Sequence, residues 1–445
     1  MNKYVVRSTI VGALGGLLFG FDTAVISGAE AGLRHSFGLS EWWLGFAVSI
    51  ALWGTVAGAL TAGSLGQRYG SREMLRLTAV LYVISAIGCA FAPNLPVFLI
   101  ARFLGGLGIG ASSVLGPVYI AELAPAHLRG RLVGTFQINI VIGILLAYLS
   151  NYIISIFNFG AREWRWELGV AAFPAILFLI LLYTIPRSAR WLATQNRTDE
   201  AREVLKLMGS SDSNAELQAI LDSLRQDQSR NGASLFERIH GRFRYGRPIF
   251  LAIAIGAFNQ FSGINAILYY LNRIFTTAGS SAASSNLKTV AVGGMNLLAT
   301  FVGMALIDRL GRKVLLLIGA AGTSICLAVV AWIFFVENHQ AMLVWALLVY
   351  IGFFAVSQGA VIWVYLSEVF PTRVRGKGQS LGAGTHWVMS GILSQLFPVV
   401  AKHSGAYPFI FFSVMTVVQF VVVLFYFPET KRVSLEQLQV ELKIV

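Results

Sequence analysis

The sequence predicts an all-α membrane protein in which twelve transmembrane helices form two six-helix bundles. Composition is the first observation: 56% of the 445 residues are hydrophobic and only 12% are charged, whereas soluble chains carry about 25% charge. The second is that apolar runs of transmembrane length recur along the chain. The third is an internal repeat that relates the first six runs to the last six.

The apolar runs place the spans and the domain boundaries. Six spans lie near 5–27, 42–66, 74–92, 96–122, 132–157 and 166–186, and six more near 248–275, 286–307, 313–335, 341–366, 379–401 and 407–427. Between them, TDEAREVLKLMG and NAELQAILDSLRQ have apolar residues at helical spacing with charges interleaved, which predicts short amphipathic helices; a disordered linker is the alternative. We therefore expect an N-terminal bundle (1–186), a cytoplasmic helical domain (187–246), a C-terminal bundle (247–428) and a cytoplasmic tail (429–445).

The net charge of +13 could indicate a nucleic-acid partner, but the basic residues gather in short connectors between spans. That distribution follows the positive-inside rule and predicts that both termini face the cytoplasm and that the partner of the spans is the lipid bilayer. Cys89 and Cys326 lie inside apolar runs and are expected to be packing residues. The chain has no nucleotide loop, metal cluster or nucleophile motif, so we expect neither an enzyme nor a cofactor.

The two halves resemble each other at equivalent places. RYGSREML (68–75) matches RLGRKVLL (309–316), and AELAPAHLRGRLVG (121–134) matches SEVFPTRVRGKGQS (367–380). Parallel six-span repeats are typical of two-bundle transporters, whose binding site lies between the bundles near the membrane midplane. The duplication therefore predicts such a site here.

Charged residues of both signs mark the cytoplasmic ends of the repeats. Glu122 with Arg129, and Glu368 with Arg375, offer one acid and one base in each half and are predicted to hold an inner gate shut. Simple positive-inside anchoring is the alternative. The full predicted network is Arg68, Glu122, Arg129, Asp308, Arg309, Arg312, Glu368 and Arg375.

Several motifs together resemble one known family, the sugar porter branch of the major facilitator superfamily, over nearly the whole chain. They are GGLLFGFDTAVISG (15–28), ARFLGGLGIG (101–110), PVYIAELAPAHLRGR (117–131), PRSARWL (186–192), NQFSGINAILYY (259–270), DRLGRK (308–313), WVYLSEVFPTRVRGKG (363–378) and FPETKRVSLEQL (427–438). The resemblance implies two six-helix bundles with a cytoplasmic helical domain. It also implies that the protein transports a monosaccharide as a monomer by alternating access.

The resemblance also implies which residues contact the sugar: Gln137, Gln260, Asn265, Asn296, Trp363 and Trp387. A sugar is a neutral ring edged with hydroxyls, so amides that donate and accept hydrogen bonds, and aromatic faces, suit it. Two neighbours join the list, Asn259 and His386, which stand where the family has glutamine and an amide. For His386, ligand contact, a packed neutral ring and a second proton site remain open. Gln260 and Asn265 are five residues apart, and Gly263 between them permits a local break that turns both toward the cavity.

Asp22 interrupts the first apolar span, and Arg102 lies near the start of the fourth. The resemblance implies that this pair couples transport to protons, because proton-coupled members carry an acid at the first position. Burial penalises a carboxylate charge and a nearby guanidinium favours it, so movement of the pair would change its proton affinity. A static ion pair between two helices is the alternative. The glycines around Asp22 are expected to form a close-packing surface.

Some residues depart from the family pattern. Gln67 and Ser71 stand where an acid and a base are usual, and Arg187 and Ala189 replace the usual Glu and Pro, which puts one clamp onto the cytoplasmic helices in doubt. Ala360 replaces a frequent proline, so any break in span ten is expected to be mild. We expect a proton-coupled monosaccharide symporter of a bacterial-type inner membrane; a passive facilitator, a polyol porter and a non-transporting sugar sensor are the alternatives.

Overall fold

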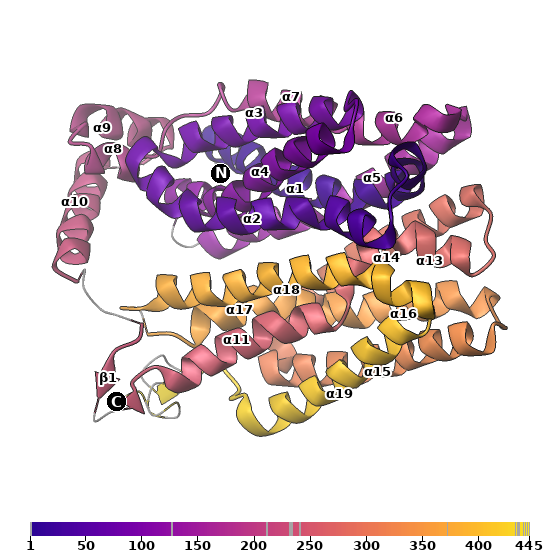
Figure 1. The fold of residues 1–445 in the computed structure, drawn as a ribbon. Helices are drawn as coiled ribbons and strands as arrows, with labels where there is room; N and C mark the ends of the chain where they lie inside the picture. Colours follow the sequence, from indigo (N-terminus) through magenta and orange to yellow (C-terminus); the bar gives the residue numbers. More distant parts are fainter. Residues whose placement is uncertain are drawn as a thin grey trace. The chain divides into compact units, whose positions relative to one another are not determined.

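The computed structural model describes residues 2–125, 128–210, 212–230, 235–239, 242–371 and 373–431, together with residues 433, 437, 438, 440, 442 and 444 (Figure 1). Within these ranges the chain is almost entirely helical, as predicted. Eleven helical segments are long and apolar enough to cross a membrane. The remaining predicted span, 379–401, is the eleventh along the chain and corresponds to the 29-residue helix α18 (Arg375–His403), which is less apolar than the others.

The first six predicted spans are all helical. Their elements are α1 (Lys3–Phe37), α2 (Glu41–Tyr69), α3 (Ser71–Ala90), α4 (Leu95–Leu123), α5 (Arg129–Phe157), the 3-10 turn η1 (Gly160–Arg162), α6 (Glu163–Gly169) and α7 (Ala172–Leu181). The first helix continues ten residues beyond the predicted end of its span at residue 27. Hydropathy marks only the apolar part of a helix, whereas backbone hydrogen bonding continues into its polar end.

The last six spans contain the breaks. Their elements are α11 (Gly246–Phe261), α12 (Ile264–Tyr269), α13 (Leu271–Thr277), α14 (Ala282–Leu310), α15 (Arg312–Val336), α16 (Ala341–Phe354), the π-helical turn η2 (Ala355–Gly359), α17 (Ala360–Glu368), α18 (Arg375–His403) and α19 (Tyr407–Tyr426). The tenth span is interrupted only by the turn η2, so the chain stays helical through Ala360, as its lack of a proline predicts.

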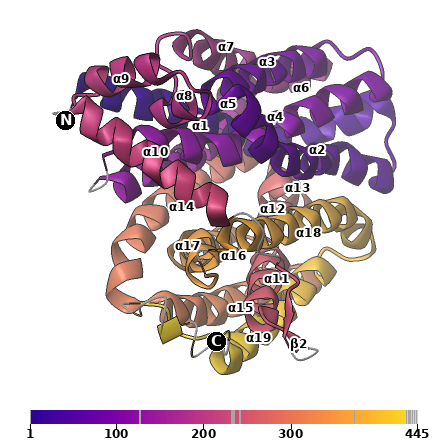
Figure 2. The ribbon, with the colours of Figure 1, turned by 90° about the vertical axis from the view of Figure 1, so that its left-hand side faces the viewer.

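The two amphipathic helices predicted in the polar stretch are present as α9 (Thr198–Leu207) and α10 (Ser213–Arg230), and the short helix α8 (Ala189–Thr194), which was not predicted, precedes them. The three helices lie together at one end of the N-terminal helices (Figure 1 and Figure 2). Their apolar faces share a small core that includes Leu192, Leu205 and Leu217. Two-residue strands β1 (Arg238–Ile239) and β2 (Arg242–Phe243) follow and pair antiparallel, which the sequence did not predict.

Contacts divide the chain into two compact units. Unit 1 comprises Met1–Ala24, Ile50–Ala147 and Arg165–Gly232, and unit 2 comprises Val25–Ser49, Tyr148–Trp164 and Ala233–Val445. Unit 2 therefore contains one end of α1, α2 and α5 together with the whole C-terminal half. The four predicted domains and their boundaries stay a prediction.

Glycines bring helix backbones of unit 1 into direct contact. A methyl group built on Gly20 of α1 would lie 1.8 Å from the carbonyl oxygen of Ile140 in α5, and one on Gly143 would lie 2.1 Å from that of Leu17. Only a residue without a side chain fits such positions. The predicted close-packing surface is therefore present on α1, and it packs on α5.

Candidate functional site

Asp22 of α1 and Arg102 of α4 form a buried ion pair within unit 1. The guanidinium Nη1 of Arg102 donates to Oδ1 of Asp22 over 2.7 Å, and the two residues are only 9% and 3% exposed. The structure thus brings together the two residues predicted to couple transport to protons. Their role in coupling stays a prediction.

The surroundings of Asp22 leave one carboxylate oxygen unused. Among the described residues, Oδ2 of Asp22 is buried and has no hydrogen-bond partner. Gly105 of α4 lies beside the pair, and a methyl group there would approach Ser85 to 2.4 Å and Asp22 to 4.0 Å. The carboxylate therefore keeps one oxygen for the guanidinium and one at which a proton can be held without breaking that contact.

In unit 2, helices α11 and α18 hold a chain of polar side chains in apolar surroundings. Nε2 of Gln260 donates to Oδ1 of Asn259 over 3.0 Å and lies 3.3 Å from both ring nitrogens of His386. All three residues are less than 9% exposed. Only an unprotonated ring nitrogen can accept an amide N–H, so this contact fits a neutral imidazole.

The predicted break at Gly263 is present, whereas its predicted effect, that Gln260 and Asn265 turn toward a cavity, stays a prediction. Gly263 has φ 84° and separates α11 from α12; residues with a side chain rarely adopt this backbone conformation. Beyond the break, Nδ2 of Asn265 donates to the hydroxyl of Ser390 on α18 over 2.9 Å. Gln260 and Asn265 therefore both face α18, although their spacing on an unbroken helix would separate them.

Two tryptophans flank His386. The ring centroids of Trp387 and His386 are 4.7 Å apart with the rings nearly perpendicular, and those of Trp363 and His386 are 5.3 Å apart. Trp363 is 38% exposed, whereas Trp387 is 4% exposed. Aromatic faces beside hydrogen-bonding amides are the two groups that a sugar ring requires.

The remaining predicted sugar contacts lie in other helices. Asn296 is buried in α14 of unit 2, and Gln137 is half-buried in α5 of unit 1. Sequence reasoning missed Gln358 in the turn η2, whose backbone carbonyl accepts Nδ2 of Asn259 over 3.4 Å. Its own amide is 1% exposed, and neither amide atom has a partner among the described residues. The signal that could have found it is a glutamine inside an apolar span.

The predicted charge network in the C-terminal half centres on Arg312. Its guanidinium donates to Glu368 over 2.9 Å and to Asp308 over 3.1 Å. Glu429, which we did not single out, accepts the backbone N–H groups of Arg312 and Lys313 over 2.9 and 3.1 Å. A carboxylate at the first turn of α15 satisfies free N–H groups and favours the helix dipole.

Two further members of that network take part in hydrogen bonds between a side chain and a backbone carbonyl. Nε of Arg375 donates to the carbonyl of Phe370 over 3.4 Å, and the carbonyl of Arg309 accepts the ammonium group of Lys431. The gating role predicted for this network stays a prediction.

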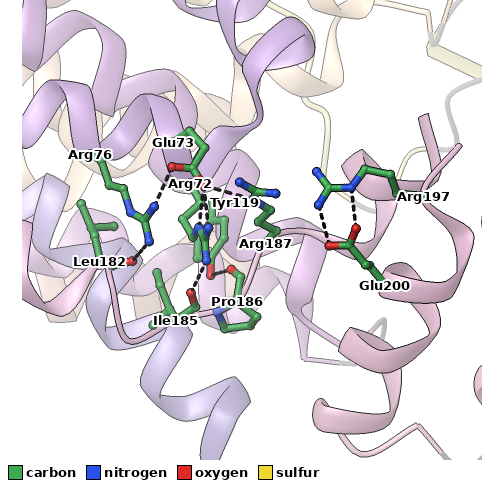
Figure 3. Close-up of polar contacts among 10 residues, drawn as sticks. All are labelled: Arg72, Glu73, Arg76, Tyr119, Leu182, Ile185, Pro186, Arg187, Arg197 and Glu200. Carbon is green, nitrogen blue, oxygen red and sulfur yellow. Dashed lines mark hydrogen bonds and ion pairs between the residues drawn. The ribbon is translucent and has the colours of Figure 1, made fainter. Parts of the chain in front are cut away.

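In the N-terminal half, the carboxylate of Glu73 accepts hydrogen bonds from three arginines (Figure 3). Arg76 donates to its carboxylate over 2.7 Å, Arg187 does so over 3.1 Å, and Arg72 donates as well. Arg187 thus reaches α3 from the connection between α7 and α8. An ion-pair clamp therefore joins this connection to α3; the doubt about a clamp onto the polar helices themselves stays untested.

Backbone contacts extend this clamp. Arg72 donates to the carbonyl of Ile185 over 2.9 Å, Arg76 to that of Leu182 over 3.3 Å, and the hydroxyl of Tyr119 to that of Pro186 over 2.7 Å (Figure 3). These bonds satisfy the carbonyl of Leu182, which caps α7, and two carbonyls of the connection that follows it. They fix the segment that leads to the polar helices.

On the polar helices, Arg197 and Glu200 form a two-bond pair at 2.6 Å each (Figure 3). The pKa of the Glu200 carboxyl lies below its usual range because Arg197 donates hydrogen bonds to it.

The other predicted charges of this half lie nearby. Glu122 accepts the hydroxyl of Ser71 over 3.5 Å, and Glu122 and Arg129 line one cavity of about 620 Å³ beneath α8, α9 and α10. Arg68 is exposed and lies over the ring of Tyr69. Among the described residues, no group of three or more His, Cys, Asp or Glu side chains could hold a metal ion.

Apolar spans in two sequence-related halves, with a buried ion pair and a buried amide cluster, define a multi-pass membrane transporter. The family described as "Sugar (and other) transporter" matches residues 8–442, and the chain belongs to this family. It is 36% identical to the D-xylose-proton symporter of Escherichia coli (98% of this chain, 96% of the relative). It is 35% identical to the glucose transport protein of Synechocystis (98% and 97%). The inward-open structure of the E. coli xylose transporter XylE matches with a TM-score of 0.86 at 35% identity, covering 98% of this chain and all of that one.

Proposed function

We propose that this protein is a proton-coupled symporter that carries a monosaccharide, a hexose or a pentose, across the cytoplasmic membrane by alternating access. The observation that carries the proposal is the buried Asp22–Arg102 pair, which offers one titratable carboxylate inside a transporter. Similarity to a D-xylose-proton symporter at 36% identity supports both the sugar and the coupling ion.

The amide cluster supports sugar binding. In this structure Gln260 donates to Asn259 and contacts His386, so the amides satisfy one another where a buried polar group would otherwise be costly. A sugar hydroxyl can replace such a partner bond for bond, and Trp363 and Trp387 can cover the apolar faces of the ring. Replacing an amide–amide hydrogen bond by an amide–sugar hydrogen bond keeps the number of hydrogen bonds, and the sugar ring gains stacking on the tryptophan rings.

The ion pair supports coupling. Arg102 stays charged, whereas Asp22 can take a proton at Oδ2. Protonation turns the ion pair into a hydrogen bond from a cation to a neutral group and weakens the tie between α1 and α4. A difference of one pKa unit between two conformations is worth about 1.4 kcal/mol of coupling. Protons bound from the outside and released inside would thereby drive uptake.

Asp22→Asn in proteoliposomes tests the coupling. The amide keeps the shape but holds no proton, so we expect sugar counterflow to persist while proton uptake and concentrative uptake are lost. Asp199→Asn, which removes a carboxylate that is 90% exposed on α9, is the control and should leave both intact. Concentrative uptake by Asp22→Asn that an uncoupler abolishes would overturn the proposal. Uncoupler-insensitive transport by the unmodified protein would indicate passive facilitation.

Gln260→Leu tests the sugar site. Thermal-shift titration of the unmodified protein with a panel of sugars and polyols identifies the ligand, and Gln260→Leu should weaken its binding at least about tenfold, or about 1.4 kcal/mol. Gln195→Leu, on an exposed amide after α8, should bind like the unmodified protein. Equal affinity in both variants would remove Gln260 from the site.

The orientation follows from the basic connectors. Both termini and helices α8, α9 and α10 face the cytoplasm, so the α1–α2 and α13–α14 connections face outward. Exposed apolar side chains such as Phe173 on α7 and Phe335 on α15 suit direct contact with the lipid bilayer, and a monomer suffices for the site. Labelling of single cysteines with a membrane-impermeant reagent tests the orientation.

A further inference from the structure

Four charged residues from α1, α2 and α13 form an ion-pair cluster within unit 2, here called the outer cluster. Nη1 of Arg273 lies 2.9 Å from Glu41 and 3.3 Å from Glu30, and Nη2 of Arg34 lies 2.8 Å from Glu41. Arg273 comes from the second sequence half, and the other three residues come from the first. The cluster therefore joins residues of the two sequence repeats within unit 2.

One side of the outer cluster is buried, and the other side is accessible to solvent. Glu30 is 4% exposed, whereas the side chains of Arg273 and Arg34 are 18% and 47% exposed. A cavity of about 600 Å³ adjoins the cluster and is lined by Glu30, Arg34, Arg273 and the hydroxyl residues Thr276 and Thr277. Since water in such a cavity can hydrate the charges when the pairs separate, the cost of breaking them is far below that of a dry ion pair.

Helix α13 is built as a separate piece. It has seven residues, it is separated from α11 by the break at Gly263 and by α12, and it ends before Gly279, which has φ 86°. Apart from the outer cluster, described polar contacts tie this region to α1 and α5: the N–H of Asn272 donates to the hydroxyl of Ser27 over 3.1 Å, and the hydroxyl of Tyr148 donates to the carbonyl of Leu268 over 2.9 Å.

This contact differs from the permanent helix contacts of the protein. Between α1 and α5, the backbones touch at Gly20 and Gly143 without intervening side chains, and separating them would expose a tightly fitted surface to solvent. Around Arg273 the contact consists of charged side chains, and water molecules can take the place of each side chain's ion-pair partner. Such a contact can open and close with little loss of packing.

We propose that the outer cluster is an electrostatic latch that holds α13 against α1 and α2 while the outside is closed, and that releases once in each transport cycle. The inference rests on the proposed function, because alternating access requires the two halves to part on the outside before sugar binds. Arg273 is the central residue, since it alone among the four residues of the outer cluster bridges two carboxylates of the other half.

Distance measurement between spin labels tests the latch in the full-length protein. Labels at Trp42→Cys on α2 and Ala283→Cys on α14, both exposed, report the separation of the outer ends; the buried cysteines Cys89 and Cys326 are replaced by alanine. Without sugar or a proton gradient, we expect Arg273→Gln to raise the ratio of long to short distances at least about tenfold. Glu41→Gln should raise the ratio as well, and the double variant should add little to Arg273→Gln, because the Arg273–Glu41 pair is already lost in each single variant.

Lys288→Gln is the matched control. Lys288 is a cation at the same end of α14 that contacts Ser280 outside the cluster, and its loss should leave the ratio unchanged. An unchanged ratio in Arg273→Gln or Glu41→Gln, or an equal shift in Lys288→Gln, overturns the latch. Should Arg273→Gln not fold, Glu41→Gln alone decides. Because the readout needs neither substrate nor proton, a failure of the proposed transport activity would leave this result standing, and the reverse also holds.

Discussion

Replacing Gly20 by alanine is expected to force α1 away from α5. The added methyl carbon would lie 1.8 Å from the carbonyl oxygen of Ile140 and 2.7 Å from its carbonyl carbon, whereas real contacts of this kind are essentially never below 3.0 Å. The obstacle is helix backbone, which cannot rotate aside as a flexible side chain can. The two helices must therefore part by about 1 Å along this seam.

The size of the effect follows from two opposed contributions. Overpacking a well-fitted interface costs about 1–3 kcal/mol, and the rigid obstacle places Gly20→Ala near the upper end. Alanine also gains about 1 kcal/mol of helix propensity over glycine. The net expectation is a loss of about 2 kcal/mol. Because Asp22 lies two residues further on, the displacement should also impair proton-linked uptake.

Gly63→Ala supplies the comparison. Gly63 lies in α2, and a methyl group built there meets no atom within 4 Å, so only the propensity gain of about 1 kcal/mol remains. We expect the apparent Tm of detergent-solubilised Gly20→Ala to fall several degrees below that of Gly63→Ala, with a shorter half-life at a fixed elevated temperature. Equal thermal behaviour of the two variants would refute the reasoning from close backbone contact.

Three further variants test other contacts. Arg187→Ala removes one of the three arginines around Glu73 and should cost about 1 kcal/mol or less; faster limited proteolysis before α9 measures it, and protection equal to that of unmodified protein contradicts it. Glu429→Gln removes the charge at the start of α15 and should lower stability by about 0.3–1 kcal/mol, seen as a small fall in Tm; an unchanged Tm contradicts it. Gly263→Ala adds strain at φ 84° and a clash with a ring, and should abolish sugar binding in a thermal-shift titration, whereas Gly294→Ala, which meets nothing within 4 Å, should bind normally.

The sequence predicts the helices because apolar length and turn residues act locally. The break between Gln260 and Asn265 is an example: a glycine between two polar residues at an awkward spacing indicated it, and Gly263 adopts the left-handed conformation that only glycine accepts easily. The family resemblance predicted the pair of Asp22 and Arg102, and the structure brings the two residues into contact.

Ionic partners could not be predicted in the same way. Glu73 and Arg187 are 114 positions apart, and Glu30 and Arg273 are 243 apart, so their meeting depends on how the helices pack. In the sequence, an arginine in a connector has the same appearance whether it anchors a span or pairs with an acid. The pair of Arg187 and Glu73 shows the consequence. The base at 187 stands where an acid is usual, and the sequence did not indicate that it would find an opposite charge in α3.

Helix α1 carries three kinds of contact in succession along its length. Gly20 fixes it to the backbone of α5, Asp22 binds it to α4 through a bond that one proton can weaken, and Glu30 joins it to Arg273 through charges that water can replace. The three contacts respond to different variables, since backbone packing depends on shape, the buried pair on protonation and the outer cluster on hydration. A substitution in the buried pair should therefore leave the signature of the outer cluster unchanged, and a substitution in the outer cluster should leave that of the buried pair unchanged. Asp22→Asn should remove proton dependence without raising the ratio of long to short outer distances to the level of Arg273→Gln, and Arg273→Gln should raise that ratio while sugar-linked proton uptake persists.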